Sequence, residues 1–199
     1  MKKRNTLLIL GALLSSVGLA ACSSSMDTKG KGIAQLMNDN QERVFYRVSD
    51  SNGDALPGKD EGIDYIYITK GGKLKGYETS KLKMDDVVGK NINEVKKLAE
   101  ERAESTYEFD KVTAKVSTDS SGNNTESERL YHYTNQYNEP DYTIYLSLTS
   151  GQIRDKYYAG YIAKTNSLVS TGDLLITEVS KGNVINFDKV DGKTVEENK

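Results

Sequence analysis

The sequence predicts an α+β fold that is mostly β: an antiparallel meander of about nine strands, strongly curved or barrel-like, with one helix that covers the sheet. Two observations support this prediction. Apolar and polar residues alternate in many short segments, and most of these are separated by short runs of Gly, Asn, Asp and Ser. Because short turns join antiparallel strands, and a long meander must manage its edges, we expect a curved antiparallel sheet.

The first strands are predicted in the N-terminal half of the chain. Residues 33–37 have the apolar spacing of one or two helical turns. Apolar residues then alternate over 44–48, and a loop dense in turn formers separates this strand from a second one at 63–69. The Lys-Gly-Gly-Lys sequence at 70–73 predicts a tight hairpin turn that leads into a third strand at 74–79.

One long helix is predicted at about 92–105. Asn91 and Glu94 have the spacing of a capping box, with Asn at the cap position. Five apolar residues then fall on one helical face: Ile92, Val95, Leu98, Ala99 and Ala103. Because a sheet with an apolar face needs a cover, we expect this helix to pack on the sheet.

Strand patterns fill the rest of the chain. The predicted strands are 112–117, 130–134, 142–149, 153–164, 173–180 and 184–190, with turns at 119–125, 150–152 and 181–183. In the strand at 153–164, Tyr157 and Tyr161 share one face and Tyr158 points to the other. The tail at 191–199 is charged, and we expect it to be frayed.

The first 22 residues have the parts of a secretory signal. Lys2, Lys3 and Arg4 precede an apolar run at 7–14, which is too short and too interrupted to span a membrane. The following Leu19-Ala20-Ala21-Cys22 resembles the lipobox of bacterial lipoprotein precursors. This resemblance implies cleavage before Cys22 and a lipid on its thiol, and several acyl chains would hold the protein stably on a membrane.

The predicted organisation follows from this leader. Residues 1–21 are a lipoprotein signal peptide, and residues 22–32 are the lipidated cysteine and a flexible tether. A single globular domain is expected at 33–190. The protein is then anchored by lipid to the cell membrane and faces outside the cytoplasm, and whether its source has one membrane or two stays open.

Composition excludes several classes of partner. Removal of the leader takes three basic residues and no acid from the chain, so the net charge changes from −2 to −5. An acidic domain is not expected to bind nucleic acid. The one cysteine is the predicted lipid site, so the mature domain has no disulfide, no thiol nucleophile and no cysteine metal site.

No recognisable catalytic set is present, and we expect neither an enzyme nor a cofactor. His132 is the only histidine, it lies in a strand pattern, and no Gly-x-Ser-x-Gly sequence accompanies it. Ser80 and Lys83 fit Ser-x-x-Lys, but the other elements of the penicillin-recognising enzymes are missing, and a chance match is expected. One histidine also argues against zinc, so the expected metal content is none.

The loop at 50–61 superficially resembles a calcium loop. The EF-hand pattern has Gly at its sixth position and Glu at its twelfth. Here Gly53 is fourth, and of these two positions only the twelfth, Glu61, matches. The oxygen-bearing side chains of this loop leave a weak calcium site open as an alternative, but a solvated turn is favoured.

Tyrosines are the remaining candidates for function. The C-terminal strands carry many of them, and tyrosine gives a large contact area at low entropic cost. The predicted binding residues are Tyr131, Tyr133, Tyr145, Tyr157, Tyr158 and Tyr161. The alternative interpretation of the same residues is ordinary cross-strand packing.

Two functions from different classes are compatible with these features. The first is a non-enzymatic binding module for a protein, peptide or envelope polymer. The second is a carrier of a small apolar ligand within a curved sheet, for which the small residues at 159, 160 and 163 would leave room. Segments at 63–73, 119–124 and 157–161 are similar to small uncharacterised surface lipoproteins of Gram-positive bacteria. This resemblance covers about half of the domain and implies no activity.

Overall fold

The computed structural model describes residues 28, 31–118, 120–121, 125–133, 140–164, 172–183 and 195–197. Within these, side chains are described over 28, 31–117, 120–121, 130, 149–162 and 172–183. The helices are α1 (Ile33–Asn38), α2 (Met84–Val87) and α3 (Ile92–Arg102). The strands are β1 (Arg43–Ser49), β2 (Gly62–Lys70), β3 (Lys73–Lys83), β4 (Ser105–Phe109), β5 (Lys111–Thr118), β6 (Thr125–Tyr133), β7 (Pro140–Ile153), β8 (Lys156–Lys164), β9 (Asp173–Val179) and β10 (Val195–Glu197).

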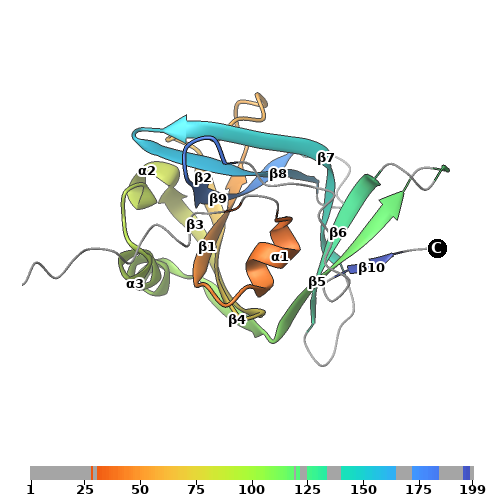
Figure 1. Cartoon of the computed structure of the whole chain (residues 1–199). Helices are drawn as coiled ribbons and strands as arrows, with labels where there is room; N and C mark the ends of the chain where they lie inside the picture. The colour runs from red at the N-terminus through yellow and green to blue at the C-terminus, as the bar shows by residue number, and fades with distance from the viewer. Residues whose placement is uncertain are drawn as a thin grey trace, which may run out of the picture.

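The strands form one sheet in the order β10-β5-β6-β7-β8-β9-β1-β2-β3-β4 (Figure 1). Neighbouring strands are antiparallel, except that β10 pairs in parallel with β5. The prediction of a mostly β, antiparallel fold is therefore confirmed. The sheet is not closed, and the count of about nine strands and the barrel-like curvature are not confirmed.

The two faces of the sheet carry two separate apolar cores. The α1 face packs the buried side of α1 against residues from β1, β2, β3, β5, β6, β8 and β9. The opposite face, here the α3 face, packs Tyr46, Ile66 and Ile176 against α2 and α3. Because side chains alternate along each strand, a strand that is covered on both faces buries nearly every residue, as β9 does.

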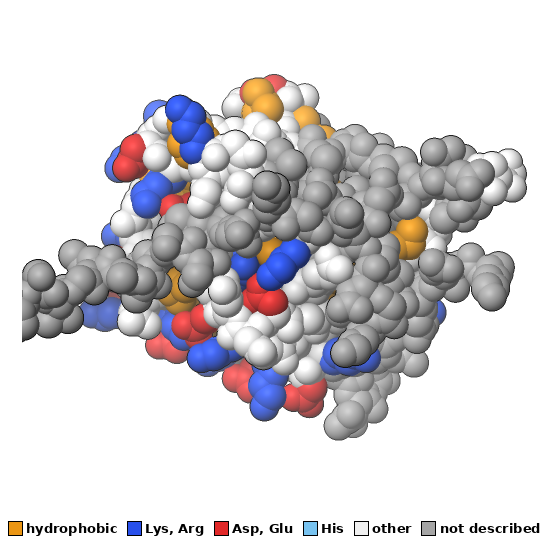
Figure 2. Space-filling model, in the orientation of Figure 1, with side chains coloured by type: hydrophobic (Ala, Val, Ile, Leu, Met, Phe, Trp, Pro, Cys, Tyr) orange, Lys and Arg blue, Asp and Glu red, His pale blue; other side chains and the backbone are white. Residues whose placement is uncertain are grey.

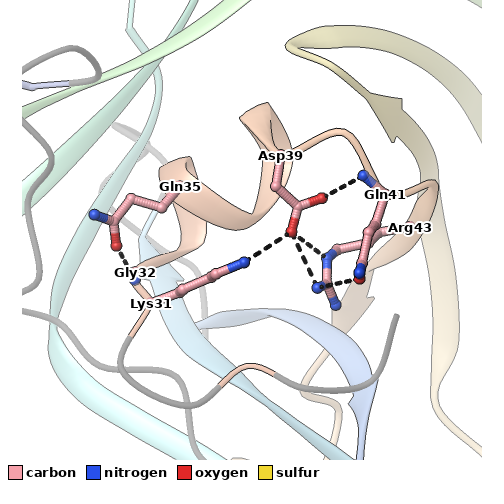
Figure 3. A network of polar contacts seen from close by, with 6 residues as sticks. All are labelled: Lys31, Gly32, Gln35, Asp39, Gln41 and Arg43. Atoms are coloured by element: carbon pink, nitrogen blue, oxygen red, sulfur yellow. Dashed lines mark hydrogen bonds and ion pairs between the residues drawn. The ribbon is translucent and has the colours of Figure 1, made fainter. Parts of the chain in front are cut away.

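A charged network holds α1 on its face of the sheet. Asp39, which follows α1, accepts hydrogen bonds from the Arg43 guanidinium at 3.1 and 3.2 Å and from the Gln41 backbone at 2.8 Å (Figure 3). Lys31 contacts the same carboxylate at 3.3 Å. Asn38 adds a 2.7 Å hydrogen bond to the backbone oxygen of Val112 in β5. These contacts fix a helix of only six residues, which is too short to be stable alone.

The predicted long helix is present but shorter than expected. Asn91 and Glu94 form the predicted capping box, with hydrogen bonds of 2.8 and 3.1 Å. The helix ends at Arg102 and not at 105, because the Glu104 backbone donates to Glu78 and β4 begins at Ser105. Pairing with β3 thus takes the residues that helical periodicity would assign to α3.

Two other sequence predictions are corrected by the structure. Residues 150–152 are not a turn, because β7 continues to Ile153 and Arg154 begins the turn with a φ of 55°. The tail at 191–199 includes β10, which is paired with β5 and is therefore not simply frayed. The leader, Cys22 and the predicted strand at 184–190 lie outside the described residues.

Candidate functional site

The described tyrosines of the predicted binding set are core residues. Tyr158 and Tyr161 are almost fully buried, on the α3 face and the α1 face respectively. Tyr157 is half-buried and packs against the core of the α1 face. Their expected alternation between the two faces is confirmed, but both faces are covered, so Tyr158 and Tyr161 are not available to a partner. Burial also raises the pKa of Tyr158 well above its ordinary value.

The other predicted residues can be placed only by their strands. Tyr131 and Tyr133 lie in β6 and Tyr145 lies in β7, where their side chains are outside the described set. His132 lies between the first two in β6 and pairs with Val112 of β5 in the backbone register. Ser80 and Lys83 are exposed on β3, and Ser80 donates a hydrogen bond to Glu104.

A charged cleft of about 380 Å³ opens where the β2–β3 hairpin meets α3 and β4. Ile68, Thr69 and Leu74 form its buried part. Its charged lining comprises Glu42, Lys70, Lys73, Lys75, Lys96, Glu100, Glu108 and Asp110. Figure 2 shows basic and acidic side chains interspersed along the lower left edge of the molecule, where Figure 1 places α3 and β4.

Local sequence sets the geometry of the hairpin that carries two of these lysines. Gly71 and Gly72 have φ values of 60° and 84°, which a two-residue hairpin turn requires and glycine adopts without strain. Lys70 and Lys73 are therefore direct cross-strand neighbours at the mouth of the cleft. Both are exposed, and neither forms an ion pair with another described residue.

The remaining cleft lysines are partly neutralised. Lys96 of α3 contacts Glu42 at 2.5 Å, with both side chains about one-third exposed. Lys75 lies 3.9 Å from both Glu100 and Glu108. The Tyr77 hydroxyl, and then these two carboxylates, raise the pKa of Lys75. The unpaired positive charge of the cleft is therefore concentrated at the hairpin.

Thr69 contributes to the buried part of the cleft, but its hydroxyl does not face it. Side chains alternate along β2, so Thr69 lies on the α1 face with Tyr67, whereas Ile68 lies on the α3 face. The polar groups that the cleft offers to a ligand are therefore its charged side chains, and among them Lys70 and Lys73 have no ion pair with a described residue.

The sequence analysis did not identify this cleft. The cluster of lysines around the Gly-Gly turn is visible in the sequence and could have suggested a basic hairpin. Lys96 and Glu42 are 54 positions apart, and only the packing of α3 beside β1 and the hairpin brings them together. The sequence favoured the tyrosines instead, and the described ones, Tyr157, Tyr158 and Tyr161, belong to a sheet that is packed on both faces.

Comparison with known proteins gives no further guide. No known protein family matches this sequence, and neither a curated protein sequence nor a solved structure shows significant similarity to it. Among the described residues, no helix has the length and apolar character needed to cross a bilayer.

Proposed function

We propose that this chain is an exported lipoprotein, held on the outer side of the cell membrane by lipid on Cys22, that acts as a non-enzymatic binding module. The lipobox-like sequence at 19–22 and the polar segment before α1 support the anchor. The sequence carries no recognisable catalytic set, which favours binding over catalysis. The partner is a protein, peptide or envelope polymer.

The observation that carries the binding function is the charged cleft between the β2–β3 hairpin, α3 and β4. Lys70 and Lys73 place two unpaired charges beside each other at its mouth. Carboxylate or phosphate groups match such a pair of ammonium donors. We therefore expect the partner to present acidic groups to the hairpin.

The alternative function, a carrier of a small apolar ligand, is less well supported. It requires space on the α1 face, and Ile33, Leu36 and Met37 occupy this face with almost no exposure. The network around Asp39 holds α1 in that position. A ligand could enter only if α1 left the sheet.

A barrel-like curvature of the sheet remains part of this proposal. Only Asp110 separates β4 from β5 in the sequence. In the strand order, however, β4 is at one end and β5 is next to the other end. In addition, α1 packs against side chains from strands along most of that order. A sheet that curls around α1 accounts for both features.

Cross-linking on intact cells tests the binding function. The double variant Lys70→Glu, Lys73→Glu reverses the charge at the mouth of the cleft. The matched control Lys81→Glu, Lys90→Glu changes the same number of exposed lysines elsewhere. We expect a specific cross-linked species with the wild type and the control, and its loss with the hairpin variant. The variant Cys22→Ala should leave the protein unprocessed or release it from the membrane.

The contrary outcomes separate the alternatives. A cross-linked species that persists in the hairpin variant would place the partner elsewhere on the molecule. No cross-link, together with an extra mass in native mass spectrometry that is lost on denaturation, would favour the carrier. Unchanged membrane association of Cys22→Ala would exclude the lipid anchor.

A further inference from the structure

The loop between β1 and β2 brings three carboxylates together. Asp50 and Glu61 are at its two ends, and Asp54 is between them in the sequence. Each of these residues offers a carboxylate oxygen within 4.8 Å of those of the other two. Calcium binds oxygen at 2.3–2.6 Å, so two ligands of one ion lie at most about 5 Å apart. The cluster therefore has the dimensions of a single-ion site.

Two of the three acids are buried without a compensating charge. Glu61 is only 1% exposed and Asp50 only 4%, whereas Asp54 is exposed. No ion pair in the described part of the chain joins a lysine or arginine to any of them. Burial, with further contributions from Asp50 and Asp54, raises the pKa of Glu61. A buried anion without a partner is strongly unfavourable, so a bound cation would stabilise the ionised loop.

One oxygen of Glu61 points independently to a ligand. Its Oε2 accepts a 2.8 Å hydrogen bond from the Gly58 backbone, but Oε1 is buried and has no partner. By contrast, the backbone already orients the other two acids. Asp50 accepts from Gly53 at 2.8 Å and from Ala55 at 2.9 Å, and Asp54 accepts from Leu56 at 2.9 Å. The Glu61 carboxylate, which lies within the cluster, therefore has an unused, dehydrated acceptor.

The order of residues in the loop agrees with this geometry. The calcium-loop pattern Asp-x-[Asp/Asn]-x-[Asp/Asn]-Gly-x₅-Glu is matched by Asp50, Asn52, Asp54 and Glu61 at positions 1, 3, 5 and 12. The sixth position, where the pattern has glycine, is Ala55. Ala55 has a φ of 60°, the left-handed conformation for which glycine is ordinarily selected. The chain thus adopts the required turn without the usual residue.

The rest of the molecule holds the loop in place. The Thr149 hydroxyl in β7 donates to the backbone oxygen of Ala55. Pro57 packs over Gly151, where an added Cβ would lie 2.9 Å from the proline ring. At the far end, the Met84 backbone donates to the Glu61 carbonyl oxygen at 3.0 Å. A cluster fixed at both ends and in the middle loses little further entropy when it binds an ion.

We propose that the β1–β2 loop is a calcium site in which Asp50, Asp54 and Glu61 supply the protein carboxylates. The remaining ligands are waters and backbone oxygens, as calcium requires six to eight oxygens. The loop is flanked by strands and not by helices, so no opening of a helix pair follows binding. The expected affinity is that of extracellular modules, a Kd of about 0.1–1 mM. The site is independent of the charged cleft and of its partner.

Thermal unfolding of the full chain in detergent, with calcium chloride as the only added ligand, tests the site. After removal of metal with a chelator, 10 mM calcium should raise Tm by about 5–10 °C if Kd is about 0.1 mM. The variant Glu61→Gln keeps an acceptor for the Gly58 backbone but removes the charge, and it should lose at least tenfold in affinity. If this variant does not fold, Asp54→Asn changes an exposed ligand and should lose affinity in the same way.

Asp60→Asn is the matched control. Asp60 is an exposed acid of the same loop, paired with Lys59 and outside the cluster. Its replacement should leave the calcium-induced shift within about 1 °C of the wild type. No shift in the wild type, or equal shifts in the wild type and in both ligand variants, would overturn the proposal. Equal loss in Asp60→Asn would also overturn it, because the effect would then follow the net charge of the loop.

Discussion

Two buried charged groups, one at the start of β1 and one just before β2, differ in the charge of their neighbours. At the start of β1, Arg43 is 2% exposed, and the Asp39 carboxylate accepts two of its hydrogen bonds. In the loop after β1, Glu61 is 1% exposed, and the charged groups that act on its carboxyl, Asp50 and Asp54, have the same sign. In the first site the buried cation has a carboxylate partner within the chain. In the second, no described lysine or arginine forms an ion pair with the three acids.

This difference separates a structural ion pair from a binding site. A buried pair that is fully hydrogen-bonded within the chain needs no other component, and its role is to fix α1 on the sheet. A buried carboxyl whose neighbours have the same charge is stabilised either by a proton or by a cation from outside the chain. The local balance of charge, more than burial alone, therefore assigns the roles of the two sites.

The largest loss of stability is expected when the partner of a buried charged group is removed. Asp39→Ala removes the carboxylate that accepts two hydrogen bonds from the buried Arg43 guanidinium. We expect a loss of about 3 kcal/mol in the free energy of unfolding, measured by chemical denaturation. Glu42→Ala is the control, because its pair with Lys96 is about one-third exposed and should contribute at most about 1 kcal/mol. Equal losses in both variants would contradict the structural role of Asp39.

In calcium-free buffer, the substitution Glu61→Gln is expected to change the free energy of unfolding by less, and in the opposite direction. Because the folded pKa of Glu61 is raised from 4.5, the folded state holds the proton more tightly than the unfolded state. Between 4.5 and the raised value, stability should fall as pH rises, and it should be regained as pH falls. Glu61→Gln lacks this dependence and should be at least as stable as the wild type at neutral pH.

Calcium should reverse that order. With the ion bound, the wild type should be the more stable protein at neutral pH. At position 61, glutamate supplies a charged ligand and glutamine does not. The measurement is Tm against pH for both proteins, with and without calcium. Parallel pH profiles for the two proteins would show that Glu61 is not the titrating group.

The smallest effect is expected at an exposed ion pair. Lys97 and Glu101 lie 3.8 Å apart on the outer side of α3, and both are more than half exposed. Lysine precedes glutamate in the helix, which is the less favourable order, and Glu101 is near the negative end of the helix dipole. Glu101→Ala should therefore change the free energy of unfolding by no more than about 0.3 kcal/mol in urea denaturation. A loss above 1 kcal/mol would mean that exposed pairs matter in this protein.

Local signals explain which parts of the fold were predictable. The capping box of α3 and the Gly-Gly hairpin depend on residues a few positions apart, and both are present where the sequence predicts them. The parallel pairing of β10 with β5 and the pairing of β1 with β9 join segments far apart in the chain. No local pattern encodes such partners. The strand β4 was not predicted, and only its first residue, Ser105, falls within the predicted helix.

The candidate sites, too, combine features that are visible in the sequence with features that only the structure shows. The acids of the β1–β2 loop are visible in the sequence, which alone favoured a solvated turn. The structure instead buries Asp50 and Glu61, because the loop is fixed on β7 and beside α2. The charged cleft required α3 to lie beside the hairpin, and only the three lysines near the Gly-Gly turn, Lys70, Lys73 and Lys75, formed a recognisable local cluster.

By itself, the sequence determined the alternation that makes this protein mostly β, the cap that begins α3 and the turn that joins β2 to β3. These features depend on backbone preferences and on contacts between near neighbours. Only the tertiary structure decided that both faces of the sheet are covered, so that Tyr158 and Tyr161 of the apparent recognition pattern are packed in two cores. Burial and charge balance are properties of the whole assembly of strands, and they decide which charged residues satisfy one another and which lack a partner.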